Sequence, residues 1–427
     1  MDQKPILSIV GLGYVGLPLA YAFAKKGYVV HGFDINVKRV EELNAGHDRT
    51  NEIEGSDLQA VGIDFTTDPE TIRVCDVIIM AIPTPVDDNK KPDLTPVIKA
   101  SQTVGKHLKK GAIVVYESTV YPGVTEEICG PILERESGMR CGTDFFLGYS
   151  PERINPGDRQ HTIDKIVKIV AGQDEHTTDV LCDLYGSIVT AGIHRAPNIK
   201  TAEMSKAIEN AQRDLNIAYM NEIALLCHKI GIETTEVIKA ASTKWNFLPF
   251  QPGLVGGHCI GVDPYYLVEK AQQLGMTTHV ITAGRAVNDG MAIFIGNEAI
   301  EAIGGLVTDK RILIMGLTFK ENIPDIRNSQ SFHVMSWLKT VKGADVFYCD
   351  PFVAKGDHEW IDVNYKSGTL NDGPYDAILL LVKHKEYIDF GTQAYIDATK
   401  KGGVIYDVKN VLDKEKITAA GRTYLAL

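Results

Sequence analysis

Ile6-Leu-Ser-Ile-Val-Gly-Leu-Gly-Tyr-Val-Gly16 joins a short apolar run to three glycines in the spacing G-x-G-x-x-G. A helical pattern follows from Leu17 to Lys26, and a second apolar run from Val29 to Phe33 leads into Asp34. A strand, a glycine-rich turn and a helix in this order are typical of a dinucleotide-binding βαβ unit. The stretch therefore predicts a doubly wound α/β fold in the first part of the chain.

Each glycine of this motif has a separate physical task. Gly11 permits the tight turn, Gly13 lets the backbone approach a pyrophosphate, and Gly16 lets the helix pack closely on the strand. The helix N-terminus adds free N–H groups and the positive end of a dipole. Asp34 is expected to bind the ribose hydroxyls and to repel a 2′-phosphate, so the sequence predicts NAD as the cofactor rather than NADP.

The apolar runs Val77–Ile82 and Ile113–Glu117 continue the alternation of strands and helices. This pattern predicts parallel strands with crossover helices in one unit over residues 1–195. Ligands bind beyond the carboxyl ends of such strands, so we expect the hydroxyl groups that follow these two runs to meet the cofactor. The alternative is that they cap turns. They belong to Thr84, Ser118 and Thr119.

The middle of the chain has helical periodicity from Asn198 to about Lys244, which predicts a long helix followed by a shorter one. A second α/β unit is expected from about Arg311, because short apolar runs return there. Those runs are Ile312–Met315, Ala344–Cys349, Ala377–Val382 and Gly403–Tyr406.

The predicted fold is therefore α/β, with two Rossmann-like doubly wound domains joined by a central long-helix domain. The predicted domain boundaries are residues 1–195, 196–305 and 306–427. A long helix between two α/β units often carries a subunit contact, so we expect a homodimer or a higher homo-oligomer.

The composition excludes several classes of protein. The chain has 427 residues, of which 44% are hydrophobic and 23% charged, which is ordinary for a globular protein of two or three domains. The net charge of -11 argues against nucleic acid as a partner. We find no signal peptide and no apolar run near the ~20 residues of a membrane span, so no membrane partner and a cytoplasmic location are expected. Seven dispersed cysteines without C-x-x-C spacing predict reduced thiols and no metal site.

One thiol, Cys259, lies among glycines in Gly256-Gly-His-Cys-Ile-Gly-Val-Asp263. Glycines allow the close approach of a second group and present backbone N–H donors. A thiolate can add to an aldehyde, and loss of a hydride from the thiohemiacetal gives a thioester that water cleaves. The sequence thus suggests oxidation of a primary alcohol to an acid. The alternative is a buried structural cysteine, which we expect for the other six.

Other polar residues are candidates for supporting this chemistry. Lys206 and Asn210 are one helical turn apart and would stabilise a thiolate and an oxyanion. Glu152 and Asp263 are carboxylates that would move protons or position water. The alternatives are a solvated helix lysine and surface or capping acids.

Six segments in this order resemble the nucleotide-sugar 6-dehydrogenase family, which includes UDP-glucose, GDP-mannose and UDP-N-acetylhexosamine dehydrogenases. The resemblance covers nearly the whole chain. It implies a four-electron oxidation at C6 of a UDP-sugar with two NAD⁺. The segments are residues 11–18, 117–123, 150–157, 202–206, 256–260 and 316–320.

The resemblance assigns roles to the candidate residues. It implies that Cys259 is the nucleophile and that Lys206 and Asn210 stabilise the oxyanion. Glu152 and Thr119 resemble the pair that serves as acid/base and positions water.

Further roles follow from the same resemblance. Asp263 resembles the acid that supports the thiol. Phe319 and Lys320 resemble residues that hold the nucleotide of the substrate, and Arg327 resembles a residue that completes the cofactor site. The other residues expected at the cofactor site are Tyr14 and Val15, and those expected at the substrate site are Arg153, Ile154, Asn155, Phe250, Gly256 and Gly257.

The segments 150–157 and 245–257 resemble the UDP-N-acetylhexosamine branch, especially the gluco/galacto type that feeds bacterial capsule or O-antigen synthesis. Arg153 and Asn155 are expected to meet a 2-acetamido group. Pro156 stands where the family has a second acid, so that acid's role does not transfer. UDP-ManNAc and UDP-glucose are alternative substrates. A two-electron 3-hydroxy-acid-type NAD dehydrogenase and an inactive nucleotide-binding protein are the alternative functions.

Overall fold

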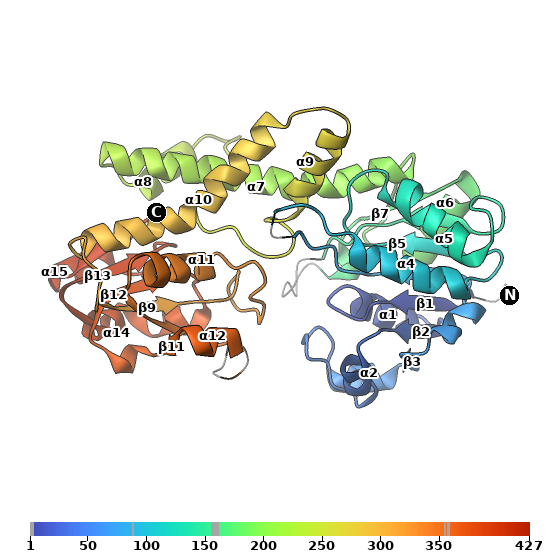
Figure 1. Ribbon diagram of the computed structural model, residues 1–427, viewed down its shortest axis with the longest axis horizontal. Helices are drawn as coiled ribbons and strands as arrows, with labels where there is room; N and C mark the ends of the chain where they lie inside the picture. The colour runs from blue at the N-terminus through green and yellow to red at the C-terminus, as the bar shows by residue number, and fades with distance from the viewer. Residues whose placement is uncertain (1–3, 88, 155–161, 354–355, 357–358) are drawn as a thin grey trace. The chain divides into compact units, whose positions relative to one another are not determined.

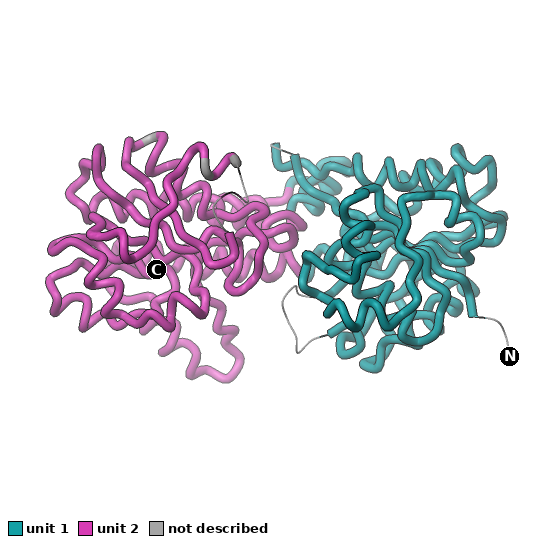
Figure 2. Tube along the Cα trace, turned by 90° about the horizontal axis from the view of Figure 1, so that it is seen from below, with its two compact units in different colours: residues 1–209, 265–277 teal, residues 210–264, 278–427 magenta. Residues whose placement is uncertain are grey.

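The computed structural model describes residues 4–87, 89–154, 162–353, 356 and 359–427 (Figure 1). The chain divides into two units, coloured separately in Figure 2. Unit 1 holds residues 1–209 and 265–277, and unit 2 holds residues 210–264 and 278–427. The boundaries predicted for three domains stay a prediction, and the two units are described in turn.

Unit 1 is built on an eight-stranded sheet with the order β3-β2-β1-β4-β5-β6-β7-β8. Strands β1, β4 and β5 are buried along their whole length, as expected for apolar runs covered on both faces. Strands β1 to β6 pair in parallel. The strands are β1 Leu7–Val10, β2 Val30–Phe33, β3 Ile63–Thr66, β4 Val77–Met80, β5 Ile113–Tyr116, β6 Phe146–Tyr149, β7 Lys168–Gly172 and β8 Ile193–Arg195.

Strand β7 departs from the all-parallel expectation, because it pairs antiparallel to β6. Between the two strands the structure describes only a short 3₁₀ turn, Ile163–Lys165. Since β7 runs backwards, its first residue, Lys168, lies toward the edge of the sheet where β5 and β6 end.

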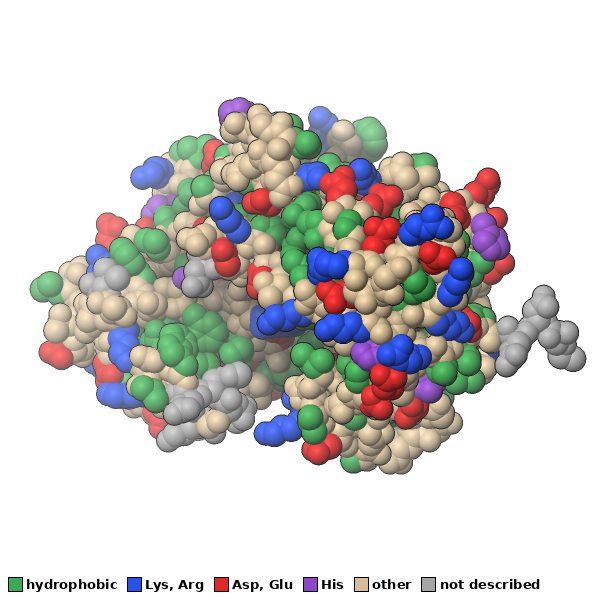
Figure 3. All heavy atoms as spheres, turned by 45° about the vertical axis from the view of Figure 1, so that its right-hand side comes forward, with side chains coloured by type: hydrophobic (Ala, Val, Ile, Leu, Met, Phe, Trp, Pro, Cys, Tyr) green, Lys and Arg blue, Asp and Glu red, His purple; other side chains and the backbone are tan. Residues whose placement is uncertain are grey.

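Helices cover the sheet of unit 1 (Figure 1). They are α1 Gly16–Lys25, α2 Val37–Asn44, α3 Gly55–Ala60, α4 Thr95–His107, α5 Gly130–Ser137 and α6 Glu175–Gly186. The first part of α7 Ile199–Ile230 and most of α9 Asp263–Gln273 also belong to this unit. Basic and acidic side chains are interspersed on the face shown in Figure 3 and do not segregate by sign.

Unit 2 holds a six-stranded parallel sheet with the order β11-β10-β9-β12-β13-β14. Its core packs on both faces of β9 and β12, which are almost entirely buried. The strands are β9 Arg311–Met315, β10 Asp345–Cys349, β11 Lys366–Ser367, β12 Tyr375–Leu380, β13 Thr399–Asp407 and β14 Thr423–Ala426.

The helices of unit 2 include the rest of α7, and the prediction of a long and then a shorter helix is confirmed by α7 and α8. Helix α7 packs closely on α10, as Gly284 of α10 shows: a Cβ atom added there would lie 2.5 Å from Leu215 of α7. The remaining helices are α8 Thr234–Ala241, α10 His279–Ala302, α11 Ser331–Ser336, α12 Glu359–Asn364, α13 Lys385–Asp389, α14 Gly391–Ala398 and α15 Lys414–Ala419.

The predicted fold class is confirmed: two parallel-sheet α/β regions accompany a long central helix. Among the residues described, no helix is both long and apolar enough to cross a membrane. All seven cysteines are free thiols.

Candidate active site

The glycine fingerprint forms the turn between β1 and α1. Gly11 has a φ of 93°, a conformation that favours glycine. A Cβ atom at Gly16 would lie 1.8 Å from the carbonyl oxygen of Gly11, so helix and strand approach too closely for any side chain there. A Cβ atom at Gly13 would meet no heavy atom within 4 Å. The open side of Gly13 fits the task predicted for it, which is to let a ligand approach the backbone.

Asp34 lies directly after β2 and holds the glycine-rich turn. Its carboxylate accepts the N–H of Leu12 at 2.8 Å and the N–H of Asn36 at 2.8 Å. Arg39, which the sequence did not single out, donates to the carbonyl of Leu12 at 2.8 Å and pairs with the buried Asp48. Each carboxylate oxygen of Asp34 has a second lone pair, so ribose hydroxyls remain possible donors.

The hydroxyl groups predicted at the cofactor site join two neighbouring loops. Ser118 donates to the carbonyl of Ile82 at 2.7 Å, and Thr84 donates to the carbonyl of Thr119 at 2.7 Å. Tyr266 of α9 donates to the carbonyl of Thr84 at 2.8 Å. Ser118 and Thr84 thus link the two loops, and their contact with the cofactor stays a prediction.

Glu203 of α7 anchors the turn that follows Thr119. It is fully buried, and its carboxylate accepts the N–H of Gly123 at 2.6 Å and the N–H of Thr125 at 3.0 Å. Burial raises the pKa of Glu203 to about 7. The sequence pattern drew attention to Lys206 in the same segment and missed this anchor.

Glu152 and Arg153 follow the end of β6. One carboxylate oxygen of Glu152 accepts the N–H groups of Arg153 at 2.6 Å and Ile154 at 2.5 Å. The guanidinium of Arg153 pairs with Glu209 at 2.9 Å and donates to the carbonyl of Val167 at 2.7 Å. Arg153 therefore already has protein partners. Its predicted neighbour Asn155 lies outside the described residues.

Helix α7 carries the two residues predicted to stabilise the oxyanion. Lys206, in unit 1, is only 8% exposed, so it is not the solvated helix lysine of the alternative reading. In unit 2, the amide of Asn210 donates to the carboxylate of Asp263 at 2.5 Å. The backbone N–H of Asp263 donates in turn to the carbonyl of Cys259 at 2.8 Å. Unit 2 thus brings three of the predicted residues, Asn210, Asp263 and Cys259, into one bonded group.

The two glycines before Cys259 pack on the turn that follows β9. A Cβ atom at Gly256 would lie 2.6 Å from the carbonyl oxygen of Asn328, and one at Gly257, whose φ is 85°, would lie 2.7 Å from the ring of Phe319. Arg327 binds Asp325 at 2.6 Å. The close approach of Asn328 and Phe319 explains why only glycine fits at Gly256 and Gly257.

A second contact ties Arg327 to the segment of the thiol. Its guanidinium lies 3.2 Å from the Nδ1 atom of His258, the residue before Cys259. The same ring meets Phe319 edge to face, with the centroids 6.2 Å apart.

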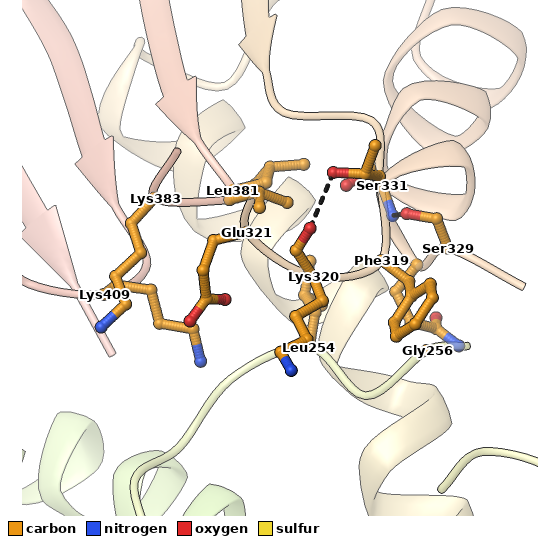
Figure 4. A pocket seen from close by; sticks show the side chains of 13 residues that line it. Leu254, Gly256, Phe319, Lys320, Glu321, Ser329, Ser331, Leu381, Lys383 and Lys409 are labelled. Atoms are coloured by element: carbon orange, nitrogen blue, oxygen red, sulfur yellow. Dashed lines mark hydrogen bonds between the residues drawn. The ribbon is translucent and has the colours of Figure 1, made fainter. Parts of the chain in front are cut away.

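A cavity of about 170 Å³ opens beside this turn in unit 2 (Figure 4). Phe319 and Lys320, both predicted to hold the nucleotide, line it, and Phe250 lies outside its lining. Burial lowers the pKa of Lys409, which donates to the carbonyl of Pro252 at 3.2 Å. The residues that line the cavity are Leu254, Gly256, Thr318, Phe319, Lys320, Glu321, Ser329, Gln330, Ser331, Leu381, Val382, Lys383 and Lys409.

The fold and the glycine turn define a dinucleotide-dependent α/β protein. Residues 6–189 match the NAD binding domain of the UDP-glucose/GDP-mannose dehydrogenase family, residues 200–290 its central domain and residues 313–414 its UDP binding domain. The chain belongs to the UDP-glucose/GDP-mannose dehydrogenase family. It is therefore an NAD-dependent UDP-sugar dehydrogenase.

Several relatives match over nearly their whole length. The chain is 49% identical to UDP-N-acetyl-D-glucosamine 6-dehydrogenase of Pseudomonas aeruginosa, with 96% of this chain and 98% of that protein covered. It is 47% identical to Protein CapL of Staphylococcus aureus, with 98% and 99% covered. Among solved structures, UDP-D-ManNAc dehydrogenase of Pyrococcus horikoshii is similar with a TM-score of 0.86 and 30% identity, with 98% of each chain covered.

Proposed function

We propose that the chain oxidises C6 of a UDP-N-acetylhexosamine, UDP-GlcNAc or UDP-GalNAc, to the uronic acid. The observation that carries the proposal is the group formed by Asn210, Asp263 and the glycine-rich segment of Cys259. The choice of sugar is supported by the 49% identity to a UDP-N-acetyl-D-glucosamine 6-dehydrogenase, against 30% to the UDP-D-ManNAc dehydrogenase.

The residues of unit 1 fit NAD. Gly13 leaves room for a ligand at the backbone, and Asp34 keeps lone pairs for ribose hydroxyls. Gly11, Gly13, Gly16 and Asp34 would hold the cofactor, which supplies the hydride acceptor when bound.

The proposed chemistry uses the chain's own groups for proton transfer and covalent attachment. The C6 hydroxyl loses a proton to Glu152 and a hydride, which gives the aldehyde. The Cys259 thiolate adds to the carbonyl carbon, and Lys206 and Asn210 stabilise the resulting oxyanion. Loss of a second hydride gives a thioester at Cys259.

Hydrolysis completes the proposed reaction. Glu152 and Thr119 position and deprotonate a water molecule, which attacks the thioester carbon. The C–S bond breaks, the sulfur of Cys259 leaves as the thiolate, and the product is the carboxylate. Asp263 holds the amide of Asn210 in place for both steps.

The substrate's nucleotide is proposed to bind in the cavity of unit 2. The ring of Phe319 offers a stacking face, and three lysines, Lys320, Lys383 and Lys409, line the cavity and would offset the diphosphate charge (Figure 4). Arg153 is bound to Glu209 and to the carbonyl of Val167, so it would meet the 2-acetamido group with the remaining donors of its five N–H groups.

The assembly, the location and the pathway are also proposals. We propose a homodimer formed through α7, because large apolar side chains of this helix are exposed; they are Met204, Ile208, Tyr219, Leu226 and Ile230. We propose a cytoplasmic location, in line with the seven free thiols, and a role in bacterial capsule or O-antigen synthesis, which depends on the sequence resemblance.

The proposal is tested by turnover with UDP-GlcNAc, UDP-GalNAc, UDP-ManNAc and UDP-glucose, with NADH counted per sugar consumed. We expect two NADH per sugar and the fastest turnover with an N-acetylhexosamine of the gluco or galacto type. One NADH per sugar would instead indicate a two-electron dehydrogenase, and faster turnover of UDP-glucose would reject the substrate assignment.

The role of Cys259 is tested separately. Cys259→Ser should abolish uronate formation. Cys182→Ser is the matched control, because Cys182 is a partly exposed thiol in unit 1 and should be replaceable. Normal uronate formation by Cys259→Ser would exclude the covalent mechanism.

A further inference from the structure

Three charged side chains meet at the carboxyl edge of the unit 1 sheet. The ammonium of Lys168 lies 2.6 Å from one carboxylate oxygen of Glu117 and 3.3 Å from one of Glu152. Tyr185 of α6 donates to the other oxygen of Glu117 at 2.6 Å. All four residues are buried, so the cluster holds two carboxylates and one ammonium away from solvent.

The topology explains how these residues meet. Glu117 follows β5, Glu152 follows β6, and Lys168 begins β7, which runs antiparallel to β6. The ends of β5 and β6 and the start of β7 therefore lie at one edge of the sheet. This is the edge at which doubly wound sheets bind their ligands.

The contacts of Glu152 leave little freedom to its carboxylate. One oxygen accepts two backbone N–H groups, and the other faces Lys168. The next residue, Arg153, is paired with Glu209. Within the described part of the chain, Lys168 is the cation that pairs with Glu152, and Glu117 shares it.

We propose that Lys168 is a positioning residue for the reaction: its ammonium holds the carboxylate of Glu152 in one orientation, and Glu117 shares this lysine. The inference depends on the proposed role of Glu152 as the acid/base group.

The electrostatics of the cluster agree with this assignment. Burial raises the pKa of Glu117 to about 7, although Lys168 lowers it. The two carboxylates raise the pKa of Lys168 against the effect of burial. The cluster has two carboxylates and one ammonium, so Glu117 and Glu152 share the stabilisation that Lys168 gives.

Two substitutions should move the acidic limb of the kcat–pH profile in opposite directions. Lys168→Met removes the cation beside Glu152, so protonation of the base persists to higher pH. We expect the limb to move up by about 1–3 pH units, with kcat recovering at alkaline pH. Glu117→Gln leaves Lys168 to Glu152 alone and should move the limb down. Lys168→Arg, which keeps the charge, should restore most of the wild-type profile.

Controls separate this role from a structural one. Lys109→Met removes a lysine that is paired with Asp76 at 2.6 Å. Asp76 directly precedes β4, so this pair lies at the opposite edge of the same sheet, and the variant should keep the wild-type kcat–pH profile. NADH affinity should be unchanged in all variants. If Lys168→Met folds poorly, Glu117→Gln, which keeps the lysine, still tests the proposal through the downward movement of the limb.

The outcomes are distinguishable. Equal loss of kcat at every pH in Lys168→Met, or an unmoved limb in Glu117→Gln, would overturn the positioning role. Glu152→Gln should be inactive across the pH range; full activity in that variant would instead overturn the proposed function of Glu152.

Discussion

Replacing Gly13 by alanine should weaken NAD binding without destabilising the fold, whereas replacing Gly16 by alanine should destabilise the fold. A Cβ atom at Gly13 meets no heavy atom within 4 Å, and its φ is not in the left-handed region. The stability of Gly13→Ala should therefore stay within about 1 kcal/mol of wild type. The methyl group would occupy the space through which a pyrophosphate reaches the backbone N–H groups.

The size of each effect follows from these contacts. Loss of one hydrogen bond to a charged phosphate costs about 1.5–3 kcal/mol, which raises the Kd for NADH about 10- to 150-fold. A Cβ atom at Gly16 would lie 1.8 Å from the carbonyl oxygen of Gly11 and 3.2 Å from Ala81, so backbone has to move. We expect Gly16→Ala to lose about 3 kcal/mol or more, roughly 6 °C or more in Tm.

The assay compares thermal unfolding by circular dichroism with NADH titration by calorimetry. Gly62→Ala is the matched control, because a Cβ atom there also meets no atom within 4 Å, yet the residue lies just before β3 rather than in the fingerprint. Wild-type NADH affinity in Gly13→Ala, or a wild-type Tm in Gly16→Ala, would refute the reasoning.

Three further predictions concern single groups. Burial raises the pKa of Glu203 from 4.5 to about 7, so the folded chain binds this proton more tightly and stability falls as the pH rises from about 4.5 to about 7. Glu203→Gln should reduce the difference between the free energies of unfolding at pH 5 and pH 8 by about 3 kcal/mol, as measured by urea unfolding. The same difference in the variant as in the wild type would contradict this prediction. Asp34→Asn should raise the Kd for NADH about tenfold or more and reduce the ratio between the Kd values for NADPH and NADH. An unchanged ratio would contradict the role of Asp34 in selecting NAD. Burial raises the pKa of Cys75 and of Cys349 to about 12. Iodoacetamide at pH 8 should therefore leave both thiols unmodified, whereas it should modify Cys259 and abolish activity. Peptide mapping can verify which cysteines are modified.

Much of the fold could be predicted because its signals are local. Each strand of the first βαβ unit is a short apolar run, and the turn between them needs glycine at Gly11 and Gly16 for steric reasons that the spacing shows. The same holds for β9 and β12, whose continuous apolar runs match buried parallel strands. The antiparallel β7 was missed, because no local pattern records the direction in which a strand returns.

The candidate site was predicted less completely, because its supports are distant in sequence. Lys168 opens an apolar strand and has the pattern of a solvated residue at a strand end, yet it is 3% exposed. Its burial results from strand order, which brings it to Glu117, 51 residues earlier. A motif that marks Lys206 says nothing of Glu203, whose partners lie 80 and 78 residues away.

The buried residues that hold these loops, such as Glu203 and Asn221, are polar for one physical reason. The loops that carry predicted catalytic residues expose backbone N–H and carbonyl groups inside the protein, where an unpaired group costs about 1–3 kcal/mol. Glu203 pairs two such N–H groups near Thr119. Asn221 pairs both the N–H and the carbonyl of Gly253, before Cys259, at 2.7 and 3.0 Å. Apolar packing alone would leave those groups unpaired and the loops free to shift. A buried side chain with matching donors and acceptors holds the loop in one position. We therefore expect substitutions at Asn221 to lower kcat by more than the loss of buried side-chain volume alone would lower it.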